Sequence, residues 1–315
     1  MKRLAAVAGV ALLLIGPAAE AQTTRHRAIV FSAVPYGRLG AIDCMDGSDP
    51  ELFTVEPSSG RVRRLTDNAN FDSYPSWSPA GRRVVFASRG RNETEQDLFI
   101  RTVDGRRRRL TDGPANDMLP RWSPTGGWIV FTRVRHYRDG FASGGDPRNL
   151  MLVRPDGSGL RRLTRRRPVY GVLSANWAPG GRRIVFTRDA RRQQSTDLFV
   201  VGRRGRNLHR ITKVRHADYS LPDWSGNGRW IAFTSEAGTS YNVFRVAPSG
   251  ERRGRLTPRH LINPHFSAWG PRSRRIAFIA GRTGCETQLF VARADGRRLK
   301  DVSRGRGLGV ESLDW

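Results

Sequence analysis

Short apolar runs recur along the chain at intervals of about 45–55 residues, and each is bounded by Gly, Pro, Ser or charged residues. Runs of this length, rich in Val, Ile and Phe, predict strands buried on both faces. No segment after residue 21 shows the period of an amphipathic helix, so the pattern predicts an all-β protein. The five clearest runs lie at 84–86, 129–131, 184–186, 231–233 and 276–278.

A tryptophan precedes each of these runs and marks the same point of a repeated unit. The recurrent tryptophans are Trp77, Trp122, Trp177, Trp224, Trp269 and Trp315. A Ser-Pro-x-Gly turn follows the first two, and the apolar run comes next. A second run such as Asp-Leu-Phe (97–99), a hairpin turn at Asp104-Gly105 and a closing Arg-Leu-Thr (109–111) complete the unit. The sequence therefore predicts four strands per unit.

The first and last units are incomplete in complementary ways. Residues 28–31 read as a second strand with no tryptophan strand before it, whereas 311–315 are a tryptophan strand with nothing after it. Pairing the two fragments predicts a six-bladed β-propeller of four-stranded antiparallel blades, closed by the C-terminal strand, with no exposed sheet edge. The expected blades are 28–66 with 311–315, 74–111, 119–164, 174–212, 221–257 and 266–303.

Motifs such as Pro-Ser-Trp-Ser-Pro-Ala-Gly-Arg-Arg-Val-Val-Phe (75–86) resemble the TolB-type β-propeller repeat, and the likeness extends over residues 27–315. The resemblance implies a non-catalytic protein-interaction module acting in a bacterial envelope. It also implies a propeller alone, without the α/β domain that precedes the propeller of TolB itself. Such a module is expected to bind an envelope or secreted protein and to be a monomer.

The N-terminus predicts export. Two basic residues, an apolar stretch and the small-x-small pattern Ala19-Glu20-Ala21 form a secretory signal peptide over 1–21, which leaves 22–315 as the propeller. An uncleaved anchor is the alternative, although the apolar stretch is short for a transmembrane span. The expected location is the periplasm or the outside of the cell. In that oxidising setting Cys44 and Cys285, in equivalent loops of the first and last blades, are predicted to form a disulfide across the seam of the ring.

Charge adds a second signal, because 55 Lys and Arg stand against 28 Asp and Glu. Nearly all the basic residues are arginine, which is typical of GC-rich codon usage. Many nevertheless lie in the first-to-second-strand and third-to-fourth-strand turns, and these two kinds of turn share one face of a propeller. That face is expected to attract an anionic polymer or lipid, or else to be merely a solvated arginine surface. Export and the absence of a recognition module argue against specific nucleic-acid binding.

The opposite face carries the connections between blades, and there the regular spacing breaks. Long loops at 33–50 and 134–148 interrupt the repeat, and long loops on a rigid scaffold often carry binding function. The connections entering the tryptophan strands are expected to place acidic and aromatic side chains at the mouth of a central funnel, where a protein partner would bind. These candidate binding residues are Asp72, Asp117, Tyr219, His265 and Glu311.

No catalytic or cofactor motif is recognisable, so the sequence predicts neither an enzyme nor a bound cofactor or metal. The alternative is a polysaccharide-active enzyme of the lyase-like propeller type. His216, His260 and His265 lie in two successive connections on the funnel side, where such an enzyme would gather histidines around a metal.

Overall fold

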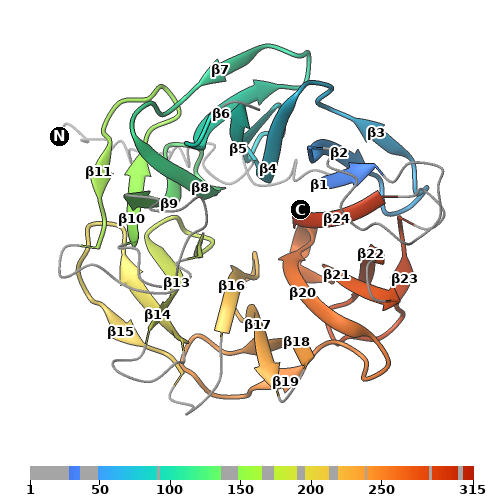
Figure 1. Cartoon of the computed structure of the whole chain (residues 1–315). Helices are drawn as coiled ribbons and strands as arrows, with labels where there is room; N and C mark the ends of the chain where they lie inside the picture. The colour runs from blue at the N-terminus through green and yellow to red at the C-terminus, as the bar shows by residue number, and fades with distance from the viewer. Residues whose placement is uncertain are drawn as a thin grey trace, which may run out of the picture.

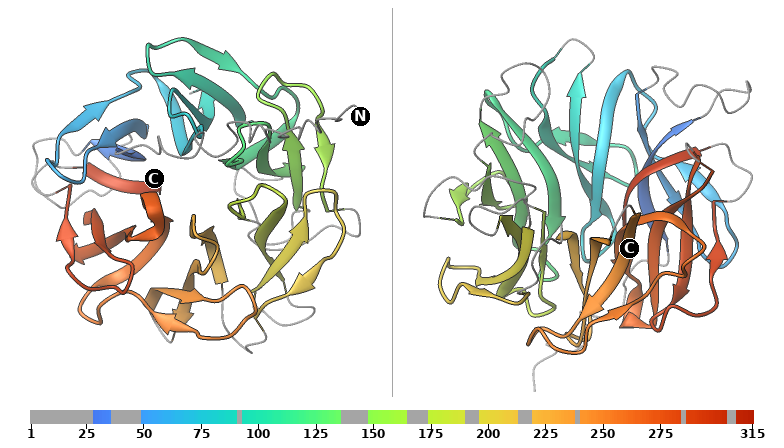
Figure 2. Two further views of the ribbon diagram at one scale, coloured as in Figure 1. Left: turned by 180° about the vertical axis from the view of Figure 1, so that it is seen from behind. Right: turned by 60° about the horizontal axis from the view of Figure 1, so that its bottom comes forward.

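The structure, a computed structural model, describes residues 28–35, 49–90, 93–135, 148–164, 174–189, 196–212, 219–237, 240–283, 286–303 and 308–315. Within these ranges, strands β1 to β24 form six four-stranded antiparallel sheets arranged in a ring (Figure 1). The predicted six-bladed β-propeller is confirmed. In each blade the tryptophan strand lies nearest the axis, and the strand carrying Arg-Leu-Thr or its variant lies at the rim (Figures 1 and 2).

The blades are built in the same order from the axis outward. Blade 1 consists of β24 (Leu308–Asp314), β1 (Ile29–Pro35), β2 (Glu51–Val55) and β3 (Val62–Arg64). Blade 2 consists of β4 (Asn70–Trp77), β5 (Arg83–Gly90), β6 (Asp97–Thr102) and β7 (Arg107–Arg109). Blade 3 consists of β8 (Ala115–Trp122), β9 (Ile129–Arg135), β10 (Arg148–Val153) and β11 (Arg161–Arg162). Blade 4 consists of β12 (Ala175–Trp177), β13 (Arg183–Asp189), β14 (Thr196–Gly202) and β15 (His209–Arg210). Blade 5 consists of β16 (Tyr219–Trp224), β17 (Ile231–Ala237), β18 (Ser240–Val246) and β19 (Gly254–Arg255). Blade 6 consists of β20 (Ile262–Trp269), β21 (Arg275–Thr283), β22 (Glu286–Arg293) and β23 (Lys300–Asp301). A 3-10 turn, η2 (Pro271–Ser273), joins β20 to β21.

The C-terminal strand closes the ring as the incomplete units predicted. β24 runs antiparallel to β1, with Phe31 opposite Leu313 and Ser32 opposite Ser312. The hydroxyl groups of Ser32 and Ser312 lie 2.6 Å apart in the interior, which fixes this register with a buried hydrogen bond. The blade that begins the chain is therefore completed by the residues that end it.

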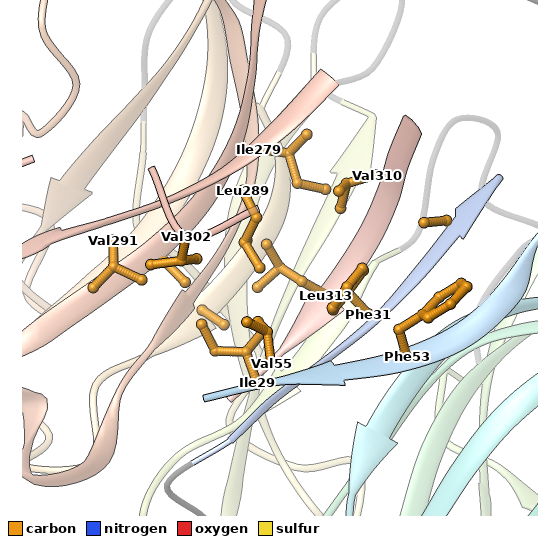
Figure 3. Packing of buried hydrophobic residues seen from close by; sticks show 13 residues of the cluster. Ile29, Phe31, Phe53, Val55, Ile279, Leu289, Val291, Val302, Val310 and Leu313 are labelled. Atoms are coloured by element: carbon orange, nitrogen blue, oxygen red, sulfur yellow. The ribbon is translucent and has the colours of Figure 1, made fainter. Parts of the chain in front are cut away.

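A separate hydrophobic cluster fills the space between blades, and the one at the seam joins blade 1 to blade 6 (Figure 3). Phe31 and Leu313 from blade 1 pack there with Ile279 and Leu289 from blade 6. The phenylalanine of the apolar run is almost fully buried in every blade, which explains why this position of the repeat does not vary. Burying a side chain of this size contributes about 1.5–3 kcal/mol. These phenylalanines are Phe31, Phe86, Phe131, Phe186, Phe233 and Phe278.

The Arg-Leu-Thr motif has a local physical cause. Its hydroxyl residue accepts a hydrogen bond from a backbone N–H of the third strand in all six blades, at 2.8 to 3.3 Å, and so ties the rim strand to its neighbour. In five blades the Nε of the arginine donates to the carbonyl oxygen of the same Thr. Arg109 and Arg210 also form ion pairs with the aspartates of Asp-Leu-Phe, Asp97 and Asp197. Part of the arginine content is therefore structural.

The two ends of the ring differ in kind. We call the end that carries turns such as 78–82 and 103–106, with their counterparts in the other blades, the turn face. The two kinds of turn do lie side by side there, since the N–H of Val103 donates to the carbonyl of Arg82 at 3.0 Å. The opposite end, which carries connections such as 67–69 and 112–114, is the connection face. Among the described residues, no helix has both the length and the apolar composition needed to cross a membrane.

Candidate functional site

The inner strands break their regular pairing at one position of the repeat. In blades 2, 3, 5 and 6 the residue three places before the tryptophan is a non-glycine residue with positive φ, between 43° and 54°. The pairing with the second strand shifts register at the same place. Left-handed backbone is costly for large side chains and is often found at functional sites. The four residues are Tyr74, Leu119, Leu221 and Phe266.

These bulges bring side chains from distant blades together. The rings of Tyr74, in blade 2, and Phe266, in blade 6, are stacked with their centroids 6.2 Å apart. Blade 1 stands between blades 2 and 6 in the ring (Figure 1), so the two rings come from blades that are not direct neighbours. Two of the four bulged residues are therefore in contact with each other.

Polar groups bridge the inner strands one step closer to the turn face. The carboxylate of Asp314 accepts the backbone N–H of Trp77 at 2.8 Å, and Asp223 does the same for Trp269 at 2.5 Å. Arg121 donates to the carbonyl of Pro75 in the neighbouring blade at 3.2 Å. These bonds satisfy two backbone donors and one backbone acceptor between sheets that share no ladder, so they hold the inner strands in place.

Asp72 does not occupy an exposed connection as the sequence suggested. It lies in β4 opposite Ser88 and has no exposed surface. Its carboxylate accepts hydrogen bonds from the Ser88 hydroxyl at 2.5 Å and from the Asn68 amide at 2.9 Å. Burial raises the pKa of Asp72, and these two hydrogen bonds oppose the rise.

Asp117 occupies the same repeat position in β8 and is also completely buried. Its two oxygens accept Nε and Nη2 of Arg133, both at 2.7 Å, in a bidentate ion pair. Burial raises the pKa of Asp117, against the hydrogen bonds and the charge of Arg133. Asp72 and Asp117 are therefore part of the wall behind the axis.

His265 and Glu311 lie one residue further along their strands and are half-buried. They come from β20 and β24, which are neighbours in the ring (Figure 1). Nδ1 of His265 lies 2.6 Å from the carbonyl oxygen of Asn263, and burial lowers the pKa of this imidazole. Burial likewise raises the pKa of Glu311. Tyr219 begins β16, but its side chain lies outside the described residues.

Several sequence predictions concern residues outside the described ranges. They include the signal peptide, both cysteines of the predicted disulfide, most of the loops 33–50 and 134–148, and His216. His260 is described and exposed, in the connection before β20. In the described ranges, no group of three or more His, Cys, Asp or Glu side chains is placed to hold a metal ion.

Sequence reasoning missed the bulges of the inner strands and the large apolar residues that occupy them. The available signal was the residue three places before each tryptophan, which is large and apolar in four units. These residues adopt a left-handed backbone, a conformation that usually favours Gly or Asn. Tyr, Leu and Phe at this position therefore do not predict a bulge.

No family model matches the chain. It is 27% identical over 206 residues to the Tol-Pal system protein TolB of Francisella tularensis subsp. mediasiatica, a match covering 65% of this chain and 45% of that protein. The chain thus spans less than half the length of that relative. Its fold resembles the crystal structure of TolB from Acinetobacter baumannii, with a TM-score of 0.72, 16% identity and coverage of 91% of this chain and 66% of that one. An oligogalacturonate lyase from Vibrio parahaemolyticus is also similar in fold, with a TM-score of 0.57, 10% identity and coverage of 86% and 78%.

Proposed function

Since the chain is a β-propeller of the TolB type, we propose that it is exported and acts as a non-catalytic protein-interaction module of the cell envelope. The similarity to a Tol-Pal system protein supports an envelope role. The partner is a protein that presents a segment to the connection-face end of the axis. The proposed contacts are His265 and Glu311, with Tyr219 on the neighbouring wall. Asp72 and Asp117 are buried and support that wall from behind without touching the partner.

The observation that carries this proposal is the set of four inner-strand bulges. Four of the six inner strands hold a large apolar residue in a left-handed conformation at the same position of the repeat. Strained backbone of this kind is often found at functional sites. The stacked rings of Tyr74 and Phe266 supply an apolar surface next to His265, whose ring meets that of Phe266 edge-on at 5.6 Å between centroids. Glu311 is half-buried on the neighbouring strand β24. An aromatic floor with a polar rim is the usual form of the energetically dominant part of a protein interface.

Affinity capture tests the proposal. Residues 22–315 would be immobilised and exposed to envelope extract, and the double variant His265→Gln, Glu311→Gln would be compared with the wild type. Capture of a discrete protein by the wild type should fall at least tenfold in the variant, which corresponds to about 1.4 kcal/mol.

The matched control is His209→Gln with Glu251→Gln, which makes the same two chemical changes at exposed positions away from the axis. This control should capture the partner as the wild type does. Equal loss in both variants, or capture that survives the axial changes, would contradict the proposed site. Release of oligosaccharides from an acidic polysaccharide would instead favour the lyase-like enzyme.

A further inference from the structure

A cleft of about 790 Å³ opens on the turn face between blades 2 and 3. Arg83 and Arg108 line it from blade 2, and Trp128, Arg154 and Pro155 from blade 3. It lies at the opposite end of the ring from the axial site proposed above. Three arginines and one acidic residue, Asp156, line the cleft, so its lining carries net positive charge.

Trp128 is the centre of this surface. Its ring is half-buried, and the guanidinium carbons of Arg154, Arg161 and Arg203 lie 5.2, 5.3 and 5.7 Å from its centroid. The face of an indole attracts cations, which is why several can gather around one ring. Three guanidinium groups around one ring concentrate positive charge there, so an anion placed near them would be bound favourably.

The cleft also has apolar surface. Pro155 and the Trp128 ring form part of its lining, and Leu160 nearby is 47% exposed. Gly159 holds the chain against the ring, because a Cβ at that position would lie 3.2 Å from Trp128 Cη2. A ligand that fits must therefore offer both negative charge and an apolar group.

We infer that this cleft binds an acidic peptide segment of a partner protein, with its carboxylates on Arg83, Arg108 and Arg154 and an apolar side chain against Trp128. Arginine binds carboxylates through two parallel hydrogen bonds, and Trp and Arg are the residues that most often dominate protein interfaces. A concave site with an aromatic wall fits a peptide side chain better than a membrane surface. A polyanion bound only by the general field would use every arginine of the turn face alike.

The combination of a tryptophan with an arginine that is not bonded to another blade is found, within the described ranges, in blade 3 and not in blade 5. Trp230 occupies the same repeat position in blade 5, but the arginine over its ring, Arg245, donates its Nη1 to the carbonyl of Ala294 at 2.7 Å. Arg154 has no such link to another blade within the described ranges, and its Nη1 reaches only Ser158 of its own turn, at 3.5 Å. Blade 3 therefore keeps an arginine available beside its tryptophan.

The test uses a random peptide library selected on the immobilised full chain, followed by fluorescence-anisotropy titration of the enriched peptide. Acidic peptides containing an apolar residue should be enriched. The double variant Arg108→Glu, Arg154→Glu changes two exposed side chains and should weaken that peptide's binding at least tenfold. Because Arg108 also donates to the carbonyl of Pro155 in blade 3, the single variant Arg154→Glu should show most of the loss while keeping the wild-type melting temperature. Trp128→Phe should weaken it several-fold.

The matched control is Arg252→Glu with Arg298→Glu, two exposed arginines in the corresponding turns of blades 5 and 6. It changes the net charge of the turn face by the same amount, and binding should stay within twofold of the wild type. Equal weakening by both double variants would overturn the proposal in favour of a diffuse arginine field. Enrichment of peptides without acidic residues would also overturn the proposal. The same holds if no peptide binds while polygalacturonate or phosphatidylglycerol vesicles bind in a way that depends on Arg108 and Arg154.

The axial variant His265→Gln, Glu311→Gln should leave peptide binding at the cleft unchanged. The two proposals can therefore fail independently.

Discussion

Replacing Asp117 by Ala should destabilise the protein strongly. The Asp117 side chain is 1% exposed and that of Arg133 is 14% exposed, so neither charge has much contact with water. Asp117→Ala removes both 2.7 Å hydrogen bonds and leaves the guanidinium of Arg133 buried without its counterion. Breaking a buried pair in this way costs about 3–5 kcal/mol. For a domain of this size, that loss lowers the melting temperature on the order of 10 °C.

The assay is urea and thermal unfolding followed by tryptophan fluorescence. Asp104→Ala is the matched control, because Asp104 pairs with Arg106 at the surface, where both side chains are more than half exposed. It should leave the urea midpoint unchanged. The double variant Asp117→Leu, Arg133→Met removes both charges and should recover most of the lost stability. If Asp117→Ala unfolds within 0.5 kcal/mol of the wild type, roughly the scatter of neutral surface changes, the inferred burial of the pair is wrong.

Four further outcomes are expected. Thr212→Val removes the acceptor for a third-strand N–H and should cost about 1–3 kcal/mol in urea unfolding, whereas Thr212→Ser should not. Burial raises the pKa of Glu311, so the folded protein binds the carboxyl proton of Glu311 more tightly than the unfolded chain does. Stability therefore falls as pH rises through the folded pKa. Glu311→Gln should flatten the curve of melting temperature against pH just above pH 4.5. Deleting residues 308–315 removes β24 and should cause aggregation or a much lower melting temperature in light scattering and calorimetry. Non-reducing peptide mapping of the exported protein should recover Cys44 linked to Cys285, and alkylation of both as free thiols would exclude that bond.

The fold could be predicted because the repeat leaves one strand over at each end. Residues 28–31 need an inner neighbour, and only 311–315 offer the tryptophan-strand pattern without a blade of their own. Edge strands must be paired or protected, so ring closure was the arrangement that satisfied both fragments. The pairing of Phe31 with Leu313 is the observed result.

The directions of the inner-strand side chains could not be predicted in the same way. Strict alternation along a strand tells which residues share a face, but a bulge resets that alternation. Tyr74 adopts its positive φ immediately before Pro75, where the sequence gives no glycine or asparagine to mark it. The carboxylate of Asp72, two residues earlier, consequently lies on Ser88 inside the blade. Its acidic character was visible in the sequence, whereas its burial depended on register.

The arginines could not be assigned to roles from the sequence, because too many of them lie in similar turns and strands. Structural and ligand-binding arginines therefore look alike in the sequence. The structure separates them by contact: Arg109 ties the rim strand to Asp97, and Arg133 neutralises Asp117. Arg83, by contrast, lies over the Trp122 ring and lines the cleft on the turn face. The fixed Arg-x-Thr spacing marks Arg109 and its counterparts in the sequence, because their Nε donates to the carbonyl two residues further on. Arg133 has no such spacing, so its pairing with Asp117 could not be found in the same way.

One position of the repeat, six residues after the recurrent tryptophan, is occupied by two different residue types and so indicates where a blade can have a special role. Six residues after the recurrent tryptophan, units 2, 4 and 6 carry arginine, whereas units 3 and 5 carry Trp128 and Trp230. Arg83 and Arg183 lie over Trp122 and Trp224 of the following blades, so arginine at this position serves blade-to-blade packing. Tryptophan at the same position cannot repeat that contact, and in blade 3 it instead becomes the wall of a cleft. A substitution that restores the packing residue, Trp128→Arg, should therefore keep the ring folded while abolishing acidic-peptide binding; retention of that binding would show that the indole is not its anchor.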